Sequence, residues 1–268
     1  MKYVKIKSIK KIPILDRYDL TVNTTRNFFA NNVLIHNTSG ISSYILCKKP
    51  LKWYEKILKK IGINIIDTHY DYIWSSRKVI KNEELNPNVE HYYKEDIWGI
   101  AHKELEPFLQ KGMTIYAEIA GYLPNGGAIQ KDYDYGCGEN QHKTFVYRIT
   151  QTNVDGKVHE FSARQVQEWC KLNGLTPVPE LFYGYAKDLF NDERLTLQNW
   201  RIKFLEEIKK RYNEKDCYLC TMKMPEEGCV VRLDDKLYCE VYKCKSIRFL
   251  EGETKMLDEG IIDIEEEN

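Results

Sequence analysis

Residues 2–35 alternate apolar and polar side chains in short runs, a pattern typical of half-buried β-strands. We predict strands at 2–12 (KYVKIKSIKKI), 18–22 (YDLTV) and 27–35 (NFFANNVLI), the last with a turn at Asn31-Asn32. No helical period occurs in this segment, and it is too short to bury a core alone. It is therefore expected to be all-β and to need a partner surface.

From Thr38 onward the pattern changes to a mixture of helical and strand periods. Apolar residues recur every three or four positions at 51–63, 95–112, 162–174 and 196–215, which predicts four helices. Gly62, Gly112 and Gly174 close three of them, and Ser162 is a predicted N-cap. Strands are predicted at 113–123, 144–154, 228–233 and 237–247. Because strands and helices do not alternate regularly, an α+β fold is favoured over a doubly wound sheet.

The charge of the chain is unevenly distributed. The 268 residues, 43% of them hydrophobic, have a formal net charge of zero and suffice for one or two domains. Residues 1–37 hold 7 basic and 2 acidic residues, whereas the tail at 251–268 holds 8 acidic residues and one lysine. The stretch 38–250 is nearly neutral, so a nucleic-acid surface there would have to be local. The basic first segment would suit an acidic partner.

Neither a membrane span nor a secretory signal is expected. No apolar run approaches about 20 residues, and the N-terminal stretch MKYVKIKSIKK is too charged for a signal peptide. The eight cysteines are scattered, and only Cys217 and Cys220 form a C-x-x-C. Reduced, structural thiols in a cytoplasmic protein are favoured, and a metal site is the less favoured reading.

The tripeptide His36-Asn37-Thr38 can support cleavage of the backbone. The Asn37 side-chain amide can attack its own main-chain carbonyl and release the bond to Thr38. His36 is a suitable acid for that step because imidazole titrates near neutral pH, and the Thr38 hydroxyl could accept an acyl group. On its own, a His-Asn pair is usually only a turn.

The wider stretch YDLTVNTTRNFFANNVLIHNT resembles the C-terminal block of inteins, the self-splicing protein segments. The matching positions are Asp19, Phe28-Phe29, Val33-Leu34-Ile35 and His36-Asn37 before a hydroxyl residue. The resemblance implies that Asp19 tunes acyl transfer. Arg26 stands where a histidine is usual, so assistance to Asn37 is in doubt. An N-terminal half with its own nucleophile is absent, which makes residues 1–37 resemble one half of a split intein of the Hedgehog/intein fold.

A second set of motifs lies near the other end of the chain. EGCVVR at 227–232 is followed at short distance by YKCKSIRFLE at 242–251. Residues two apart on a strand point to the same face, so Lys243 and Lys245 would present two ammonium groups side by side to phosphates. A lone K-x-K is usually a solvated strand edge, but its position after E-G-x-V-V makes that reading much weaker.

These motifs resemble the covalent nucleotidyltransferases, most closely RNA ligases of the bacteriophage RNA ligase 2 type, over nearly all of residues 38–250. The resemblance implies a ligase domain of mixed antiparallel sheets and helices, ATP-grasp-like in architecture. Glu227 would help to hold Mg²⁺ or Mn²⁺, and Lys243 and Lys245 would contact ATP phosphates. The helical C-terminal domain of some relatives is expected to be absent.

Three further positions match the same family. Glu118, in IYAEIAGY, would face the nucleotide ribose, and Tyr147, in FVYRI, would stack on adenine with Phe145 on the same face. Arg77, in WSSRKVI, would contact a phosphate. The family usually has an acid where this chain has Arg148. Core and surface roles remain the plain alternatives for the aromatic residues and Arg77.

The nucleophilic lysine of the family motif K-x-[D/H]-G-[T/S] is missing, but Thr38-Ser39-Gly40 resembles the residues that follow its glycine. A partner chain, carrying the lysine and the N-terminal intein half, is therefore expected. The spliced product would be an ATP-dependent RNA ligase acting on RNA in the cytoplasm, and the resemblance to the bacteriophage enzymes makes a phage-infected cell one setting for it. The alternatives are a DNA ligase, a capping-type guanylyltransferase, or an inactive nucleic-acid-binding module. The expected divisions are 1–37, 38–250 and the tail 251–268.

Overall fold

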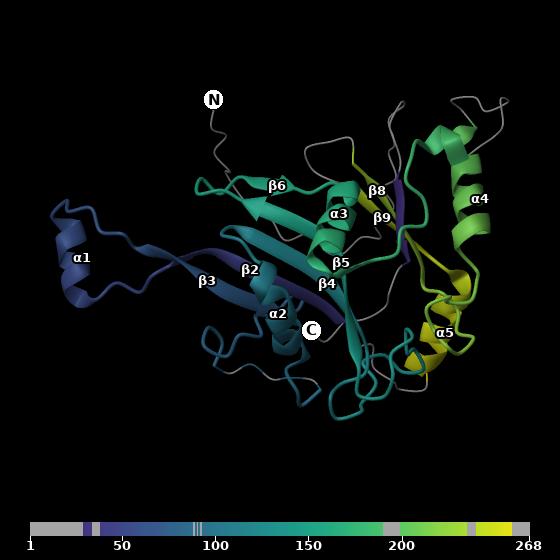
Figure 1. Cartoon of the computed structure of the whole chain (residues 1–268), viewed down its shortest axis with the longest axis horizontal. Coiled ribbons are helices and arrows are strands. Elements are labelled where there is room, and N and C mark those ends of the chain that lie inside the picture. Colours follow the sequence, from purple (N-terminus) through teal and green to yellow (C-terminus); the bar gives the residue numbers. More distant parts are fainter. Residues whose placement is uncertain are drawn as a thin grey trace.

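A computed structural model of the chain describes residues 29–33, 38–87, 89, 91, 93–189, 199–234 and 240–258 (Figure 1). Its strands are β1 (Phe29–Val33), β2 (Thr38–Lys48), β3 (Thr68–Ser75), β4 (Met113–Gly121), β5 (His142–Thr152), β6 (Val158–Glu160), β7 (Thr176–Pro177), β8 (Gly228–Leu233) and β9 (Glu240–Lys245). Its α-helices are α1 (Trp53–Lys60), α2 (Ile97–Leu105), α3 (Ala163–Asn173), α4 (Trp200–Tyr212) and α5 (Ile247–Asp258). Two 3₁₀ turns are η1 (Glu106–Phe108) and η2 (Ala186–Leu189).

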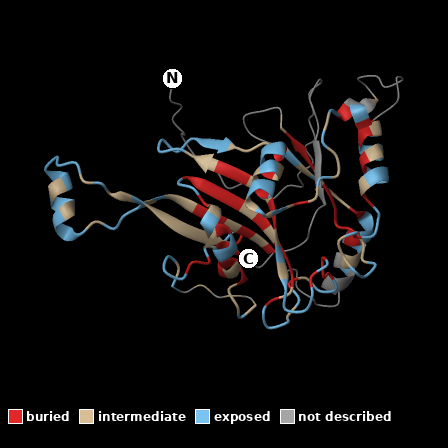
Figure 2. Ribbon diagram, viewed as in Figure 1, coloured by how far each residue is buried: buried red, intermediate tan, exposed pale blue. Residues whose placement is uncertain are grey.

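The larger sheet has the strand order β3-β2-β4-β5-β6, with antiparallel neighbours, and β7 lies parallel to β5. One face is covered by helices, because Ile115, Val146 and Ile149 pack in one core cluster with Val166 and Cys170 of α3. Ile119 packs with Ile97 and Trp98 of α2 in a second cluster. Figure 2 shows the central strands β4 and β5 as the most buried part of this sheet, whereas β3 is intermediate and β6 mostly exposed.

The smaller sheet has the order β1-β8-β9, and both pairings are antiparallel. Cys229, Val231 and Leu233 of β8 are buried against Phe204 and Ile208 of α4. One face of this sheet is therefore turned to α4, and its other face is turned to the larger sheet, as Figure 1 shows.

The structure confirms the α+β class and several predicted elements. Helix α3 has the predicted Ser162 N-cap in a reciprocal capping box with Gln165, and Gly174 closes it with φ 67°. Helix α2 is shorter than predicted and continues into η1, where Pro107 removes a backbone donor. Sequence reasoning assigned no element to 38–48 or 68–75, which form the paired strands β2 and β3. It also missed α5, which extends into the acidic tail.

Part of the predicted strand at 27–35 is present as β1, but the turn predicted at Asn31-Asn32 is wrong. The strand runs through both residues, and the register shifts there: Ala30 pairs with Val231, and Val33 pairs with Cys229. Three steps along β1 match two along β8, which defines a bulge. The predicted strands at 2–12 and 18–22 lie outside the described residues. The predicted boundary at 37/38 falls between β1 of the smaller sheet and β2 of the larger one, yet β1 pairs with β8 from the other side of that boundary. The division into domains stays a prediction.

Within the described ranges, the helices are too short or too polar to cross a membrane.

Candidate functional site

Glu118 lies on the face of the larger sheet that the helices leave uncovered. Its neighbours Ala117 and Ile119 are buried on the helix-covered side, so the alternation of β4 turns Glu118 the other way. Ser39 of β2 is its direct cross-strand partner, and the Ser39 hydroxyl donates a 2.7 Å hydrogen bond to Oε1 of Glu118. Ser39, the second residue after the predicted splice junction, thus orients the predicted ribose-binding carboxylate.

Tyr147 reaches the same face through a bulge in β5. Tyr116 pairs with Arg148 and Ala117 pairs with Val146, which leaves Tyr147 as the extra residue. Its hydroxyl hydrogen-bonds with Ser39, and burial, reinforced by the nearby Glu118 carboxylate, raises the pKa of the Tyr147 phenol well above its ordinary value. Ser39, Glu118 and Tyr147 therefore form one connected group.

Phe145 is buried in a core cluster with Tyr133, Tyr135 and Phe249, and Tyr147 packs against the same cluster. The predicted common face of Phe145 and Tyr147 is confirmed.

Glu227 and the two lysines come from the smaller sheet. Glu227 is buried directly before β8, and its backbone carbonyl accepts a 2.7 Å hydrogen bond from the Ser246 amide. The Lys245 ammonium lies 3.8 Å from Oε1 of Glu227. Gly228 has φ 140°, and a Cβ there would collide with the Cys244 carbonyl, so only glycine fits after Glu227. The E-G pair is thus required by the backbone of this corner.

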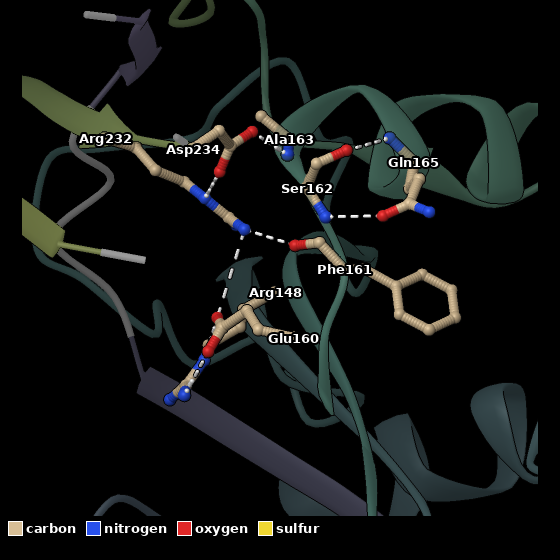
Figure 3. A network of polar contacts seen from close by, with 8 residues as sticks. All are labelled: Arg148, Glu160, Phe161, Ser162, Ala163, Gln165, Arg232 and Asp234. Carbon is tan, nitrogen blue, oxygen red and sulfur yellow. Dashed lines mark hydrogen bonds and ion pairs between the residues drawn. The ribbon is translucent and has the colours of Figure 1, made fainter. Parts of the chain in front are cut away.

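The predicted shared face of Lys243 and Lys245 agrees with their register, since they lie opposite Val230 and Gly228 respectively. Arg232 belongs to the same face of β8, and it reaches the larger sheet, where it donates to the Phe161 carbonyl (Figure 3). The lysines therefore face the larger sheet. The Lys245 ammonium is 5.6 Å from the ring centre of Phe249, which belongs to the aromatic cluster that Tyr147 contacts.

A buried charge network, which sequence reasoning missed, joins the two sheets beside this face (Figure 3). Glu160 accepts hydrogen bonds of 2.6 and 2.8 Å from Arg148 and lies 4.0 Å from Arg232. Arg232 also donates to Asp234, whose other oxygen accepts from the Ala163 amide. Arg148 stands where the family usually has an acid, and its guanidinium lies 4.6 Å from the Tyr116 ring centre. Predicting the place of Arg148 in this network would have needed knowledge of the fold.

The remaining predicted residues are less closely tied to this group. Thr38 is buried, and its hydroxyl lies 2.9 Å from the Tyr93 hydroxyl. Arg77 is exposed on the turn after β3, so its phosphate contact stays a prediction. Asp19, His36 and Asn37 lie outside the described residues, as does Arg26.

The donor set at Glu227 suits a hard cation only in part. Among the described residues, no three His, Cys, Asp or Glu side chains gather closely enough to hold a metal ion. Glu227 supplies one buried carboxylate, and Mg²⁺ is commonly held by one or two carboxylates together with substrate phosphates and water. The residues therefore fit an ion that arrives with a phosphate ligand. Cys217 and Cys220 are free thiols, as the sequence favours.

Neither a protein-family model nor a curated protein sequence matches the chain. Solved structures do match it, among them an RNA ligase mutant from Naegleria gruberi with ATP and manganese, at 16% identity and a TM-score of 0.50. That match covers 85% of this chain and 52% of the ligase. An apo mutant of Naegleria gruberi RNA ligase matches at 16% identity with a TM-score of 0.48, covering 84% of this chain and 51% of the other.

This chain therefore spans about half the length of the two ligase chains. The first match establishes an RNA-ligase-like fold. The intein resemblance of residues 1–37 gains no support from these comparisons and stays a prediction.

Proposed function

We propose that the chain is a trans-splicing precursor whose product is an ATP-dependent RNA ligase. The observation that carries the ligase part is that Lys243 and Lys245 lie on a sheet face turned toward the strands that hold Glu118 and Tyr147, with Glu227 3.8 Å from Lys245. The two cations suit the phosphates of a nucleoside triphosphate, a carboxylate can accept hydrogen bonds from the ribose hydroxyls, and an aromatic ring can stack on the base.

In the proposed reaction, a lysine of the partner chain attacks the α-phosphate of ATP and releases pyrophosphate. Lys243 and Lys245 balance the negative charge on the phosphates, Glu118 binds the ribose and Tyr147 stacks on adenine. AMP then passes to an RNA 5′-phosphate, and a 3′-hydroxyl displaces AMP to join the strands.

A Mg²⁺ or Mn²⁺ ion bound with ATP would neutralise further phosphate charge. Glu227 is the carboxylate placed to contact such an ion. The 3.8 Å distance between this carboxylate and the Lys245 ammonium supports a shared role of the two groups at the ATP phosphates.

The splicing part of the proposal rests on sequence. Asn37 would cyclise with His36 as the acid, Asp19 would tune acyl transfer, and Thr38 would accept the acyl group. Thr38 then remains in the product, where its hydroxyl meets Tyr93 at the start of β2. The partner supplies the N-terminal intein half and the nucleophilic lysine.

Labelling with α-³²P-ATP tests the ligase part. The chain alone should form no covalent adduct, whereas the product joined to its partner should carry AMP that acid removes, as expected of a phosphoramidate. An adduct on the isolated chain would place the nucleophile within residues 38–268 and reject the divided active site. Nicked RNA, nicked DNA and 5′-triphosphate RNA as substrates separate RNA ligase from DNA ligase and capping activity. A joined product that takes no label would instead indicate the inactive binding module.

A further inference from the structure

Strands β2 and β3 continue beyond the body of the larger sheet and end in helix α1, which lies at the far tip (Figure 1). Side chains of α1 are not buried against any other part of the described chain, as the pale and tan helix in Figure 2 shows. A helix held out in this way contributes nothing to the core. Its surface composition therefore indicates what it meets.

The tip is strongly basic. Six lysines are exposed between residues 48 and 60, at positions Lys48, Lys49, Lys52, Lys56, Lys59 and Lys60. Only two acids oppose them. Glu55 caps the Lys52 amide and lies 3.7 Å from Lys49, and Asp67 pairs with Lys59.

The other four lysines, Lys48, Lys52, Lys56 and Lys60, have no ion-pair partner in the described part of the chain. Lys52, the N-cap of α1, and Lys56 and Lys60 within the helix are spaced four residues apart. Together with Lys48 at the end of β2 they are called the α1 lysine row. Trp53, which is 75% exposed, borders that row.

The same hairpin begins at the candidate site. Thr38 and Ser39 start β2 beside Glu118, and Lys48 ends it. Ten residue steps at about 3.3 Å place Lys48, the first residue of the row, about 33 Å from the start of β2. This distance corresponds to roughly ten base pairs at 3.4 Å per pair.

We propose that the α1 lysine row, Lys48, Lys52, Lys56 and Lys60, binds the phosphate backbone of a nucleic-acid duplex whose end or nick occupies the candidate site. The proposal rests on the proposed function for the choice of nucleic acid over an acidic protein. A polyanion held at the start of β2 can extend along the arm formed by β2, β3 and α1 and meet these four lysines, which form no ion pair within 4 Å in the described part of the chain.

The test uses the full chain and fluorescent nicked RNA duplexes with about 6 or about 24 base pairs on each side of the nick, lengths that fall short of or exceed the arm. In one variant, Lys48, Lys52, Lys56 and Lys60 are all changed to Gln, which preserves helix propensity. The control variant changes four exposed lysines elsewhere to Gln, namely Lys103, Lys131, Lys157 and Lys210.

We expect the arm variant to bind the long duplex at least about 10-fold more weakly, with a salt dependence shallower by about 3 in log–log slope. Its binding to the short duplex should change less than about 2-fold, and the control variant should resemble the wild type. An equal loss on both lengths, or no loss on the long duplex, would overturn the proposal. The proposal would also be overturned if the arm variant bound RNA normally but failed to associate with the partner chain, because the row would then bind an acidic protein. AMP labelling of the joined product does not require the lysine row, so the labelling experiment tests the proposed function independently of this proposal.

Discussion

Nε of Arg232 donates a 2.7 Å hydrogen bond to Oδ1 of Asp234, and both side chains are buried where the smaller sheet meets the larger one. Arg232 also donates to the Phe161 carbonyl and lies 4.0 Å from Glu160. One guanidinium thus satisfies a carboxylate on its own strand end and groups on the neighbouring sheet. The relative position of Lys243, Lys245 and Tyr147 depends on this junction.

Arg232→Leu should lower the free energy of unfolding by about 3–5 kcal/mol, because it leaves the carboxylates of Asp234 and Glu160 buried without their shared cation. Urea unfolding followed by circular dichroism measures the change. Arg248→Leu is the matched control, since its pair with Asp216 is nearly half exposed and should contribute less than about 1 kcal/mol. Equal losses in the two variants would show that the buried network does not hold the sheets.

Acid should destabilise the protein through His102. The ring is 3% exposed and stacks on Trp74 at 4.8 Å between centres. Burial lowers the pKa of His102 below its ordinary value of 6.5, although Glu106 and Asp96 oppose the shift. A lowered pKa means that the unfolded chain takes up the proton first. The stability that depends on His102 being neutral is therefore fully present above about pH 6.5 and is lost as the pH falls below that value.

The test measures urea unfolding midpoints between pH 5 and 7.5, a range around the ordinary histidine pKa of about 6.5. As the pH falls, the midpoint should decrease less for His102→Gln than for the wild type. His69→Gln, at an exposed histidine of β3, should leave the wild-type slope unchanged. A wild-type slope in His102→Gln would assign the acid loss to other groups.

In the joined product, Lys243→Ala or Lys245→Ala should slow formation of the AMP adduct by about 10²–10³, the usual effect of removing one preorganised charge at a reacting phosphate. Single-turnover labelling with radioactive ATP gives the rate. Lys210→Ala removes an exposed lysine of α4 and should leave the rate as it was. Full activity in both strand variants would contradict the proposed phosphate site.

If residues 1–37 act as the proposed intein half, Asn37→Ala should prevent their separation from residues 38–268 while leaving association with the N-terminal half intact, because the side-chain amide is the group that would cyclise. Denaturing gels of the mixed halves show the products. Mature ligated protein from the Ala variant would reject Asn37 cyclisation.

Local signals in the sequence predicted the parts of the fold that depend on few neighbours. The Ser162 cap and Gly174 terminus of α3 act within one helical turn, and the alternation at 228–233 marks a strand with one apolar face. The two-residue spacing of Lys243 and Lys245 likewise predicted that their side chains lie on one face of the strand. These features are set by residues a few positions apart, so a single sequence reveals them.

Long-range features could not be read in the same way. Strand β2 has serines at 39, 42 and 43, which conceal its apolar alternation, yet Ser39 orients Glu118 only because the two meet across 79 residues. The bulge at Tyr147 arises from the pairing register of β5 with β4, and Arg148 hydrogen-bonds to Glu160 on the neighbouring strand β6. Partners of this kind are fixed by topology, for which residue spacing carries no signal.

The pairing of β1 with β8 has a consequence for the order of events during synthesis. Phe29 pairs with Arg232, so the ribosome must add about 200 residues after β1 before its partner strand exists. At roughly 5–20 residues per second, β1 emerges about 10–40 s ahead of β8. During this interval a strand from another chain meets no competition from β8 for residues 29–33. Afterwards it has to displace a neighbour that belongs to the same molecule, so the timing of encounter, as well as affinity, decides which pairing forms.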